Sequence, residues 1–190
     1  MCKILPLLNI FSYFCSMKLI NEKIEWVIAQ HKNTNHMYAE YLPYEYHLRM
    51  VVGVFERFKH LVEEIKREDV RLACFAHDTI EDTRVTYNDV KSVLGFYVAD
   101  LVYTLTNEKG KTRKERANDK YYEGIRSEKY GVFVKMCDRI ANVEYSKMSG
   151  SRMFEMYKKE NEDFIKSLDI KEYHMCYPMK VYLDKVFEVN

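Results

Sequence analysis

Two adjacent pairs of chemically active residues, His77-Asp78 and Glu81-Asp82, lie close together near the middle of the chain. The residues before them are mostly apolar, which indicates a buried helix, where charged groups are costly unless they are paired or coordinated. Residues four apart are neighbours on a helix, so we expect His77 to share a face with Glu81, and Asp78 with Asp82. Imidazole and carboxylate groups together suit Mn, Fe or Zn. The segment therefore predicts a metal site with proton-transfer groups beside it.

Two further residues extend this to a candidate ligand set: His47, at the start of an upstream helix, and Asp138, in an apolar segment downstream. Each alone has an ordinary structural explanation, because a lone histidine signals little and Asp138 is adjacent to the cation Arg139. The order His, His-Asp, Asp on three separate predicted helices is far more specific. Two imidazoles and two carboxylates leave positions on a metal open for water and substrate, as metal-assisted hydrolysis requires.

The elements that must position these residues are predicted to be α-helices, because apolar residues recur with helical spacing and strand signals are sparse. Thr86 with Asp89 three residues later is typical of a capping box, and Gly95 is typical of a helix end. The polar loop 31–46 leads into the helix that carries His47. The predicted helices cover residues 19–30, 47–61, 68–81, 87–94, 96–106, 111–125, 130–148, 152–167 and 174–186.

Length and composition limit the class of protein that this chain can be. The 190 residues fit one domain with a sizeable core. Lys and Arg number 30 and Asp and Glu 29, so the net charge of +1 gives no global field that would attract nucleic acid or a membrane. Five cysteines without CxxC spacing are typical of free thiols in a reducing compartment, and we expect a cytoplasmic protein. The sequence does not decide between a monomer and a homo-oligomer.

We divide the chain into an N-terminal extension and one domain. Residues 1–16 are apolar and are either an addition ahead of a working initiator at Met17 or a short signal segment. The run is too short to cross a membrane and lacks an A-x-A-like cleavage site. Residues 17–190 form the single domain. Within it, a Ser-Gly-Ser break sets off residues 152–190, which we expect to form helices that cover the core.

Three ordered motifs resemble those of a known family. Segment 31–47, in which Pro43-Tyr44 precedes the last histidine, is similar to H…G-x-P-Y-x-x-H. The sequence HDTIEDT at 77–83 resembles HDxxEDT, and KMCDRIAN at 135–142 resembles KLADRLxN. The chain thus resembles HD-domain phosphohydrolases, specifically the hydrolase domain of the RelA/SpoT family and its small stand-alone alarmone hydrolases of the metazoan SpoT homologue type.

This resemblance implies an HD-domain helical bundle with a metal site between its central helices. The implied reaction removes the 3′-pyrophosphate from ppGpp or pppGpp and yields GDP or GTP and pyrophosphate. Glu81 and Asp82, one or both, would orient the attacking water and carry its proton. The resemblance implies Mn²⁺, or another divalent transition metal, held by His47, His77, Asp78 and Asp138.

The resemblance also implies contacts to a nucleotide substrate. Asn142 would meet the substrate near the metal, and Tyr145, close by in sequence, is a further candidate. The basic segment 109–116 contains Gly-Lys-Thr but is not a phosphate loop, because Leu105 stands where glycine is required. Its position resembles the family segment that supplies cations to phosphates, and the candidates are Lys109, Lys111 and Arg116.

The chain departs from the family pattern before His47. Where the alarmone hydrolases carry an Arg-Lys pair and a glycine, this chain has His36, Met37 and Tyr41. We therefore expect His36 to stack on a base without supplying a fixed charge. Rival functions stay open: another HD phosphohydrolase (a 5′-nucleotidase, a dNTP triphosphohydrolase or an NADPH 2′-phosphatase), or a nucleotide-binding protein without turnover.

Overall fold

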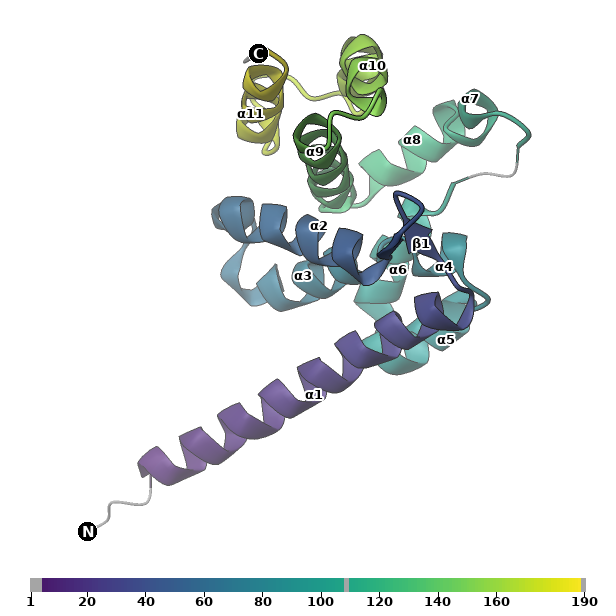
Figure 1. Cartoon of the computed structure of the whole chain (residues 1–190). Helices are drawn as coiled ribbons and strands as arrows, with labels where there is room; N and C mark the ends of the chain where they lie inside the picture. The colour runs from purple at the N-terminus through teal and green to yellow at the C-terminus, as the bar shows by residue number, and fades with distance from the viewer. Residues whose placement is uncertain (1–4, 108–109, 189–190) are drawn as a thin grey trace.

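The computed structural model describes residues 5–107 and 110–188 and confirms the all-α prediction. A long helix, α1 (Leu5–Asn33), is followed by a hairpin of two short strands, β1 (Met37–Tyr38) and β2 (Leu42–Pro43). Figure 1 shows α1 with its N-terminal end projecting beyond the other helices. The remaining elements are, in chain order, α2 (Glu45–Phe58), two 3₁₀ turns (Lys59–Leu61 and Glu64–Lys66), α3 (Arg67–Ala76), α4 (Thr79–Asp82), α5 (Tyr87–Leu94), α6 (Phe96–Leu105), α7 (Arg113–Arg116), α8 (Asp119–Ser127), α9 (Gly131–Met148), α10 (Met153–Ser167) and α11 (Tyr177–Glu188).

Helix α9 is the centre of the bundle and packs against α2, α3, α6, α8, α10 and α11 (Figure 1). Its residues Phe133, Met136 and Ile140 are fully buried, because a helix that is apolar around most of its circumference requires neighbours on every side. Phe133 meets Phe55 of α2 edge to face, with ring centroids 6.1 Å apart. Asp138 therefore lies on the helix that the fold holds most firmly.

Helices α10 and α11 both pack against α9. An exposed ion pair helps to fix α11: Arg57 of α2 donates to both carboxylate oxygens of Glu144 on α9, each at 2.7 Å. The same guanidinium lies 2.9 Å from the Tyr182 hydroxyl of α11. Two parallel N–H···O bonds fix orientation better than a single contact does. The network thus ties three helices together at one end of the bundle.

The prediction of a single helix through the His77-Asp78 segment is wrong, because α3 ends just before these residues and α4 begins just after them. Asp78 has φ −96° and ψ 1°, outside the helical range. On a regular helix, adjacent side chains point about 100° apart. The break removes this constraint and lets two adjacent residues face the same point.

The break also corrects the expected faces. His77 and Glu81 do not share a helix face, because they lie on opposite sides of the interruption. Asp82 N still donates to Asp78 O at 2.9 Å, so these two carboxylates keep the spacing of one helical turn.

The loop predicted over 31–46 contains a hairpin that the sequence did not indicate. Its strands pair antiparallel, with Tyr38 opposite Leu42. The tip residues Ala39 and Glu40 have φ values of 50° and 72°, a left-handed conformation that residues other than glycine adopt rarely. Because neither tip residue is glycine, the usual sequence signal of a tight turn is missing.

Other helix boundaries differ less from the predictions. Helix α1 begins at Leu5 rather than at residue 19, and the helix predicted over 111–125 is divided into α7 and α8. Asn118 causes this division, because its side chain caps α8 by accepting a hydrogen bond of 3.1 Å from Tyr121 N.

The predicted start and end of one helix are confirmed. The capping box of Thr86 and Asp89 is present, and the helix it starts ends at Gly95, which has φ 100°. Within 5–107 and 110–188, no helix combines the length and the apolar character needed to cross a lipid bilayer. The described free thiols, all buried, are Cys74, Cys137 and Cys176.

Candidate metal centre

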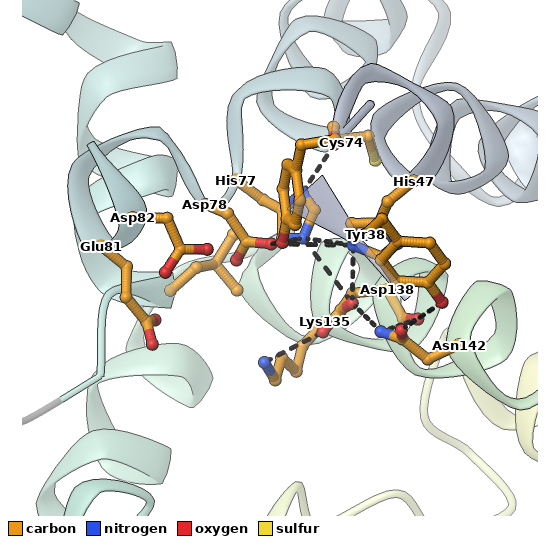
Figure 2. Close-up of polar contacts among 12 residues, drawn as sticks. Tyr38, His47, Cys74, His77, Asp78, Glu81, Asp82, Lys135, Asp138 and Asn142 are labelled. Carbon is orange, nitrogen blue, oxygen red and sulfur yellow. Dashed lines mark hydrogen bonds and ion pairs between the residues drawn. The ribbon is translucent and has the colours of Figure 1, made fainter. Parts of the chain in front are cut away.

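The four predicted ligands converge on one point between the helices (Figure 2). His47 comes from the first turn of α2, His77 and Asp78 from the break between α3 and α4, and Asp138 from the middle of α9. His47 Nε2 lies 3.3 Å from His77 Nε2, 3.6 Å from Asp78 Oδ2 and 3.4 Å from Asp138 Oδ1. His77 Nε2 lies 2.9 Å from Asp78 Oδ2 and 3.6 Å from Asp138 Oδ1. Both imidazoles are buried, at 1% and 2% exposure.

The ionisation of the cluster follows from these contacts. Burial alone would lower the pKa of His47 and His77, but the Asp78 and Asp138 carboxylates outweigh it and raise both pKa values. Burial likewise opposes ionisation of the two carboxyl groups, but His77 and His47 hold the pKa of Asp78 well below its usual range, and Lys135, followed by the two histidines, does the same for the pKa of Asp138. The cluster thus contains two carboxylates in close contact with two imidazoles.

The orientation of each imidazole is suited to metal binding. His77 Nδ1 lies 3.0 Å from the Cys74 carbonyl oxygen, which can only accept, so Nδ1 carries a proton and Nε2 is left for the cluster. His47 Nδ1 is buried without a hydrogen-bond partner among the described residues, so the polar contacts of this ring are made by Nε2.

The donor spacing also fits a metal. Ligand atoms bonded to one ion at about 2.1 Å lie about 3.0 to 3.4 Å from one another. The contacts around His47 Nε2, at 3.3 to 3.6 Å, are close to this range. His47, His77 and Asp78 present ligand atoms that all lie within 4.8 Å of one another. Two nitrogen and two carboxylate donors are a set that Mn²⁺, Fe²⁺ or Zn²⁺ accepts.

Asp78 is held by an aromatic stack that the sequence did not single out. The Tyr44 hydroxyl donates a short hydrogen bond to Asp78 Oδ2. The Tyr44 ring lies against His36, with centroids 3.8 Å apart and planes inclined by 18°, and against His31, with centroids 4.7 Å apart and planes inclined by 19°. The proximity of Tyr44 to His47 in the Pro-Tyr-x-x-His motif was the only sequence signal for this role.

Asp138 is held by hydrogen bonds from Lys135 and Asn142. Lys135, one turn before it on α9, donates to Oδ2 at 3.1 Å. The Asn142 amide, one turn after it, donates to Oδ1 at 2.5 Å, and its own carbonyl oxygen accepts a hydrogen bond of 2.9 Å from the Tyr38 hydroxyl. Tyr38 also stacks on the His47 ring, with centroids 4.9 Å apart and planes inclined by 15°. Burial raises the pKa of Tyr38, so its hydroxyl keeps its proton.

The cluster opens into a cavity of about 1420 Å³ that α8 and α10 help to line. Asp82 lines this cavity, and burial together with the Asp78 and Glu81 carboxylates raises the pKa of Asp82 to about 7. Glu81 also reaches the cavity, but Asn107 engages its carboxylate through a backbone donor at 3.2 Å and a side-chain donor at 2.6 Å. The two carboxylates predicted as bases therefore differ, because Asn107 binds the Glu81 carboxylate and not that of Asp82.

Only some of the residues predicted to contact substrate line the cavity. Asn142 and Arg116 line the cavity. Among the other described candidates, Lys111, His36 and Tyr145 do not line it, and Lys109 lies outside the described residues. Residues that line the cavity and were not predicted include Tyr121, Arg126, Lys135, Arg139, Tyr157 and Lys166.

His36 and Tyr145 have other partners. One ring face of His36 is occupied by Tyr44, and its Nδ1 lies 3.7 Å from Asp82 Oδ2. The Tyr145 hydroxyl lies 3.2 Å from the Tyr41 hydroxyl, outside the cavity. Their predicted contacts with substrate stay predictions.

No protein-family model matches the chain. Two proteins named guanosine-3′,5′-bis(diphosphate) 3′-pyrophosphohydrolase MESH1 match it in sequence. The one from Danio rerio is 29% identical over 128 residues, which cover 67% of this chain and 69% of that protein. The one from Drosophila melanogaster is 25% identical over 123 residues, 64% of this chain and 66% of that protein.

Two solved structures are similar in fold. One is described as a metazoan ortholog of SpoT that hydrolyses ppGpp; its TM-score is 0.69 at 19% identity, over 90% of this chain and 94% of that one. The other is a protein of Listeria monocytogenes, with a TM-score of 0.56 at 23% identity, over 75% of this chain and 99% of that one. These likenesses agree with the helical bundle described above.

Proposed function

Because the chain is homologous to the MESH1 pyrophosphohydrolases, we propose that it removes the 3′-pyrophosphate from ppGpp and pppGpp in a reaction that depends on a divalent metal. One observation carries the proposal: the Nε2 atoms of His47 and His77 each lie within 3.6 Å of one carboxylate oxygen of Asp78 and one of Asp138, and His47, Asp78 and Asp138 line a large cavity. Structural sites close all metal positions, whereas this set opens to a space where water and a nucleotide fit.

We propose Mn²⁺ as the resident ion, held by His47, His77, Asp78 and Asp138. A bound divalent ion supplies Lewis acidity, which activates water and polarises a phosphate ester. The surrounding residues prepare the site: Tyr44 and Lys135 orient the two carboxylates through the hydrogen bonds described above.

Asp82 is the proposed proton acceptor. It lies one helical turn beyond Asp78, lines the cavity and is not engaged by Asn107. Glu81 holds the segment after α6 through its two contacts to Asn107, and so supports the wall of the cavity. A carboxylate beside the ligands is well placed to orient the water and take its proton.

Recognition of the nucleotide is assigned to the cavity walls. Arg116 is proposed to bind phosphate, because a guanidinium matches phosphate oxygens with paired donors. Asn142 reaches the cavity beside Asp138 and would contact the substrate near the ion. His36 is not proposed as the base platform, because Tyr44 already covers one face of its ring.

The proposal is tested with a panel of ppGpp, pppGpp, NADPH, dNTPs and nucleoside monophosphates, each incubated with Mn-loaded protein and resolved by chromatography. We expect GDP and pyrophosphate from ppGpp, and no turnover by the matched His77→Ala variant. Hydrolysis of NADPH, a dNTP or a monophosphate with ppGpp left intact would replace the proposed substrate. Equal turnover by His77→Ala would remove the metal centre from the reaction.

A further inference from the structure

Tyr38 connects the hairpin to the metal cluster through two separate contacts. Its hydroxyl donates to Asn142 Oδ1 at 2.9 Å, and its ring lies nearly parallel to the His47 imidazole, with centroids 4.9 Å apart (Figure 2). The first contact joins residues that are 104 positions apart in the sequence.

The first contact decides which way the Asn142 amide points. An asparagine amide has one accepting oxygen and one donating nitrogen, so a donor at the oxygen directs the nitrogen to the opposite side. Because Tyr38 donates to Oδ1, Nδ2 faces Asp138 and donates to its Oδ1 at 2.5 Å and to its backbone oxygen at 3.1 Å. The reverse orientation would place the amide oxygen against a carboxylate.

The oxygen that receives this hydrogen bond is the one that faces the histidines. Asp138 Oδ1 lies 3.4 Å from His47 Nε2 and 3.6 Å from His77 Nε2, whereas Oδ2 is engaged by Lys135. The chain Tyr38, Asn142, Asp138 therefore fixes the rotation of one candidate ligand. The stacked ring of Tyr38 restricts a second ligand, His47.

The hairpin that carries Tyr38 is itself held in an uncommon conformation. Its tip residues, Ala39 and Glu40, have φ values of 50° and 72°. Left-handed conformations at residues other than glycine cost free energy and tend to occur where the surroundings enforce them, often at functional sites. Pairing of Tyr38 with Leu42 in the hairpin places the phenol ring directly over His47.

We propose that Tyr38 is a positioning residue of the metal centre, acting through Asn142 on Asp138 and directly on His47. The proposal rests on the metal-dependent function proposed above. Surrounding groups that orient metal ligands typically change metal affinity or activity 10- to 100-fold when they are lost. The Tyr38 hydroxyl contacts Asn142, and Tyr38 does not line the cavity.

The test measures Mn²⁺ affinity without nucleotide, by titration with detection of free Mn²⁺ by electron paramagnetic resonance. Tyr38→Phe keeps the ring and removes the hydroxyl, and we expect its affinity to fall about tenfold. Tyr38→Leu removes both contacts and should bind more weakly still. Tyr41→Phe is the matched control in the same hairpin, because it removes a hydroxyl contact to Tyr145 only, and its affinity should stay within about twofold of wild type.

A double-mutant cycle separates positioning from simple packing. If the hydroxyl acts through the amide, adding Tyr38→Phe to Asn142→Ala should cause no further loss of Mn²⁺ affinity. The same tenfold loss in both backgrounds would overturn the proposal. Wild-type Mn²⁺ affinity in Tyr38→Phe with a lowered melting temperature would also overturn it and leave a structural role only.

Turnover is recorded separately, so that the two proposals can fail independently. Dependence of Mn²⁺ affinity on Tyr38, in a protein that hydrolyses no nucleotide, would refute the proposed function and support the positioning role. Hydrolysis of ppGpp by a protein whose Mn²⁺ affinity does not depend on Tyr38 would support the proposed function and refute the positioning role.

Discussion

Acid should destabilise this protein through His31, a fully buried histidine in the stack beneath Tyr44. Burial is the largest cause that lowers the pKa of His31, to about 4, and the positive charge expected on neighbouring histidines adds to it, while Asp78 acts in the opposite direction. Its ring is 1% exposed, and its Nε2 has no hydrogen-bond partner among the described residues. Protonation would therefore place a charge inside the fold with no hydrogen-bond acceptor at Nε2.

The magnitude follows from the shift. Because the folded pKa of His31 lies below the unfolded value of 6.5, the unfolded chain binds more protons, and stability is lost as pH falls from 6.5 towards 4. A shift of this size lowers the free energy of unfolding by about 3 kcal/mol at a pH where His31 is protonated in both the folded and the unfolded state. About 2 kcal/mol of it should be lost between pH 7 and pH 5.

The assay is urea unfolding of wild type and His31→Phe at pH 7 and pH 5, with chelator present. Phenylalanine keeps a ring against Tyr44 but cannot be protonated. We expect wild type to lose about 2 kcal/mol more than the variant over this interval, because all other titrating groups are shared. Any constant cost of the substitution cancels in the difference. Equal losses in the two proteins would refute the assignment of His31 as a buried neutral histidine.

Three further substitutions separate chemistry, binding and packing. Asp82→Asn should keep Mn²⁺ affinity but lower kcat by about 10² or more, measured by pyrophosphate release; a kcat near wild type would remove Asp82 as the proton acceptor. Arg116→Ala should raise KM for ppGpp about tenfold with kcat nearly unchanged, and an unchanged KM would exclude its phosphate contact. Phe133→Ala should lower the free energy of unfolding by about 3 to 5 kcal/mol in denaturant titration, because it empties the contact between α9 and α2. A loss below about 1 kcal/mol would contradict that packing.

The clustering of these four side chains could be predicted because it depends on residue types and their order. His47, His77-Asp78 and Asp138 stand on separate apolar periodic segments, and such segments must pack together to bury their faces. The helices around them follow from the same periodicity. The central position of α9 agrees with a sequence whose apolar residues are spread around the helix and are buried on most sides.

The break between α3 and α4 could not be predicted, because local preference in that segment favours a continuous helix. Partners from elsewhere in the chain engage both residues of the break: Asp78 accepts a hydrogen bond from Tyr44, 34 positions away, and His77 meets His47, 30 positions away. Tertiary contacts of this kind override helix propensity.

The hairpin was missed for a related reason. Its tip carries Ala39 and Glu40 where glycine or asparagine would have signalled a turn. With the hairpin unknown, Tyr38 had no assigned partner, and His36 was interpreted as a base contact rather than as a ring stacked on Tyr44.

The most direct test of the account is the position of the ion. A crystal of the protein grown with Mn²⁺, measured at the manganese absorption edge, should give one anomalous peak bonded to the Nε2 atoms of His47 and His77 and to carboxylate oxygens of Asp78 and Asp138. The same crystal form of Asp78→Ala should lose that peak. A manganese ion bound elsewhere, or a protein that hydrolyses ppGpp with no ion between these four side chains, would contradict the account.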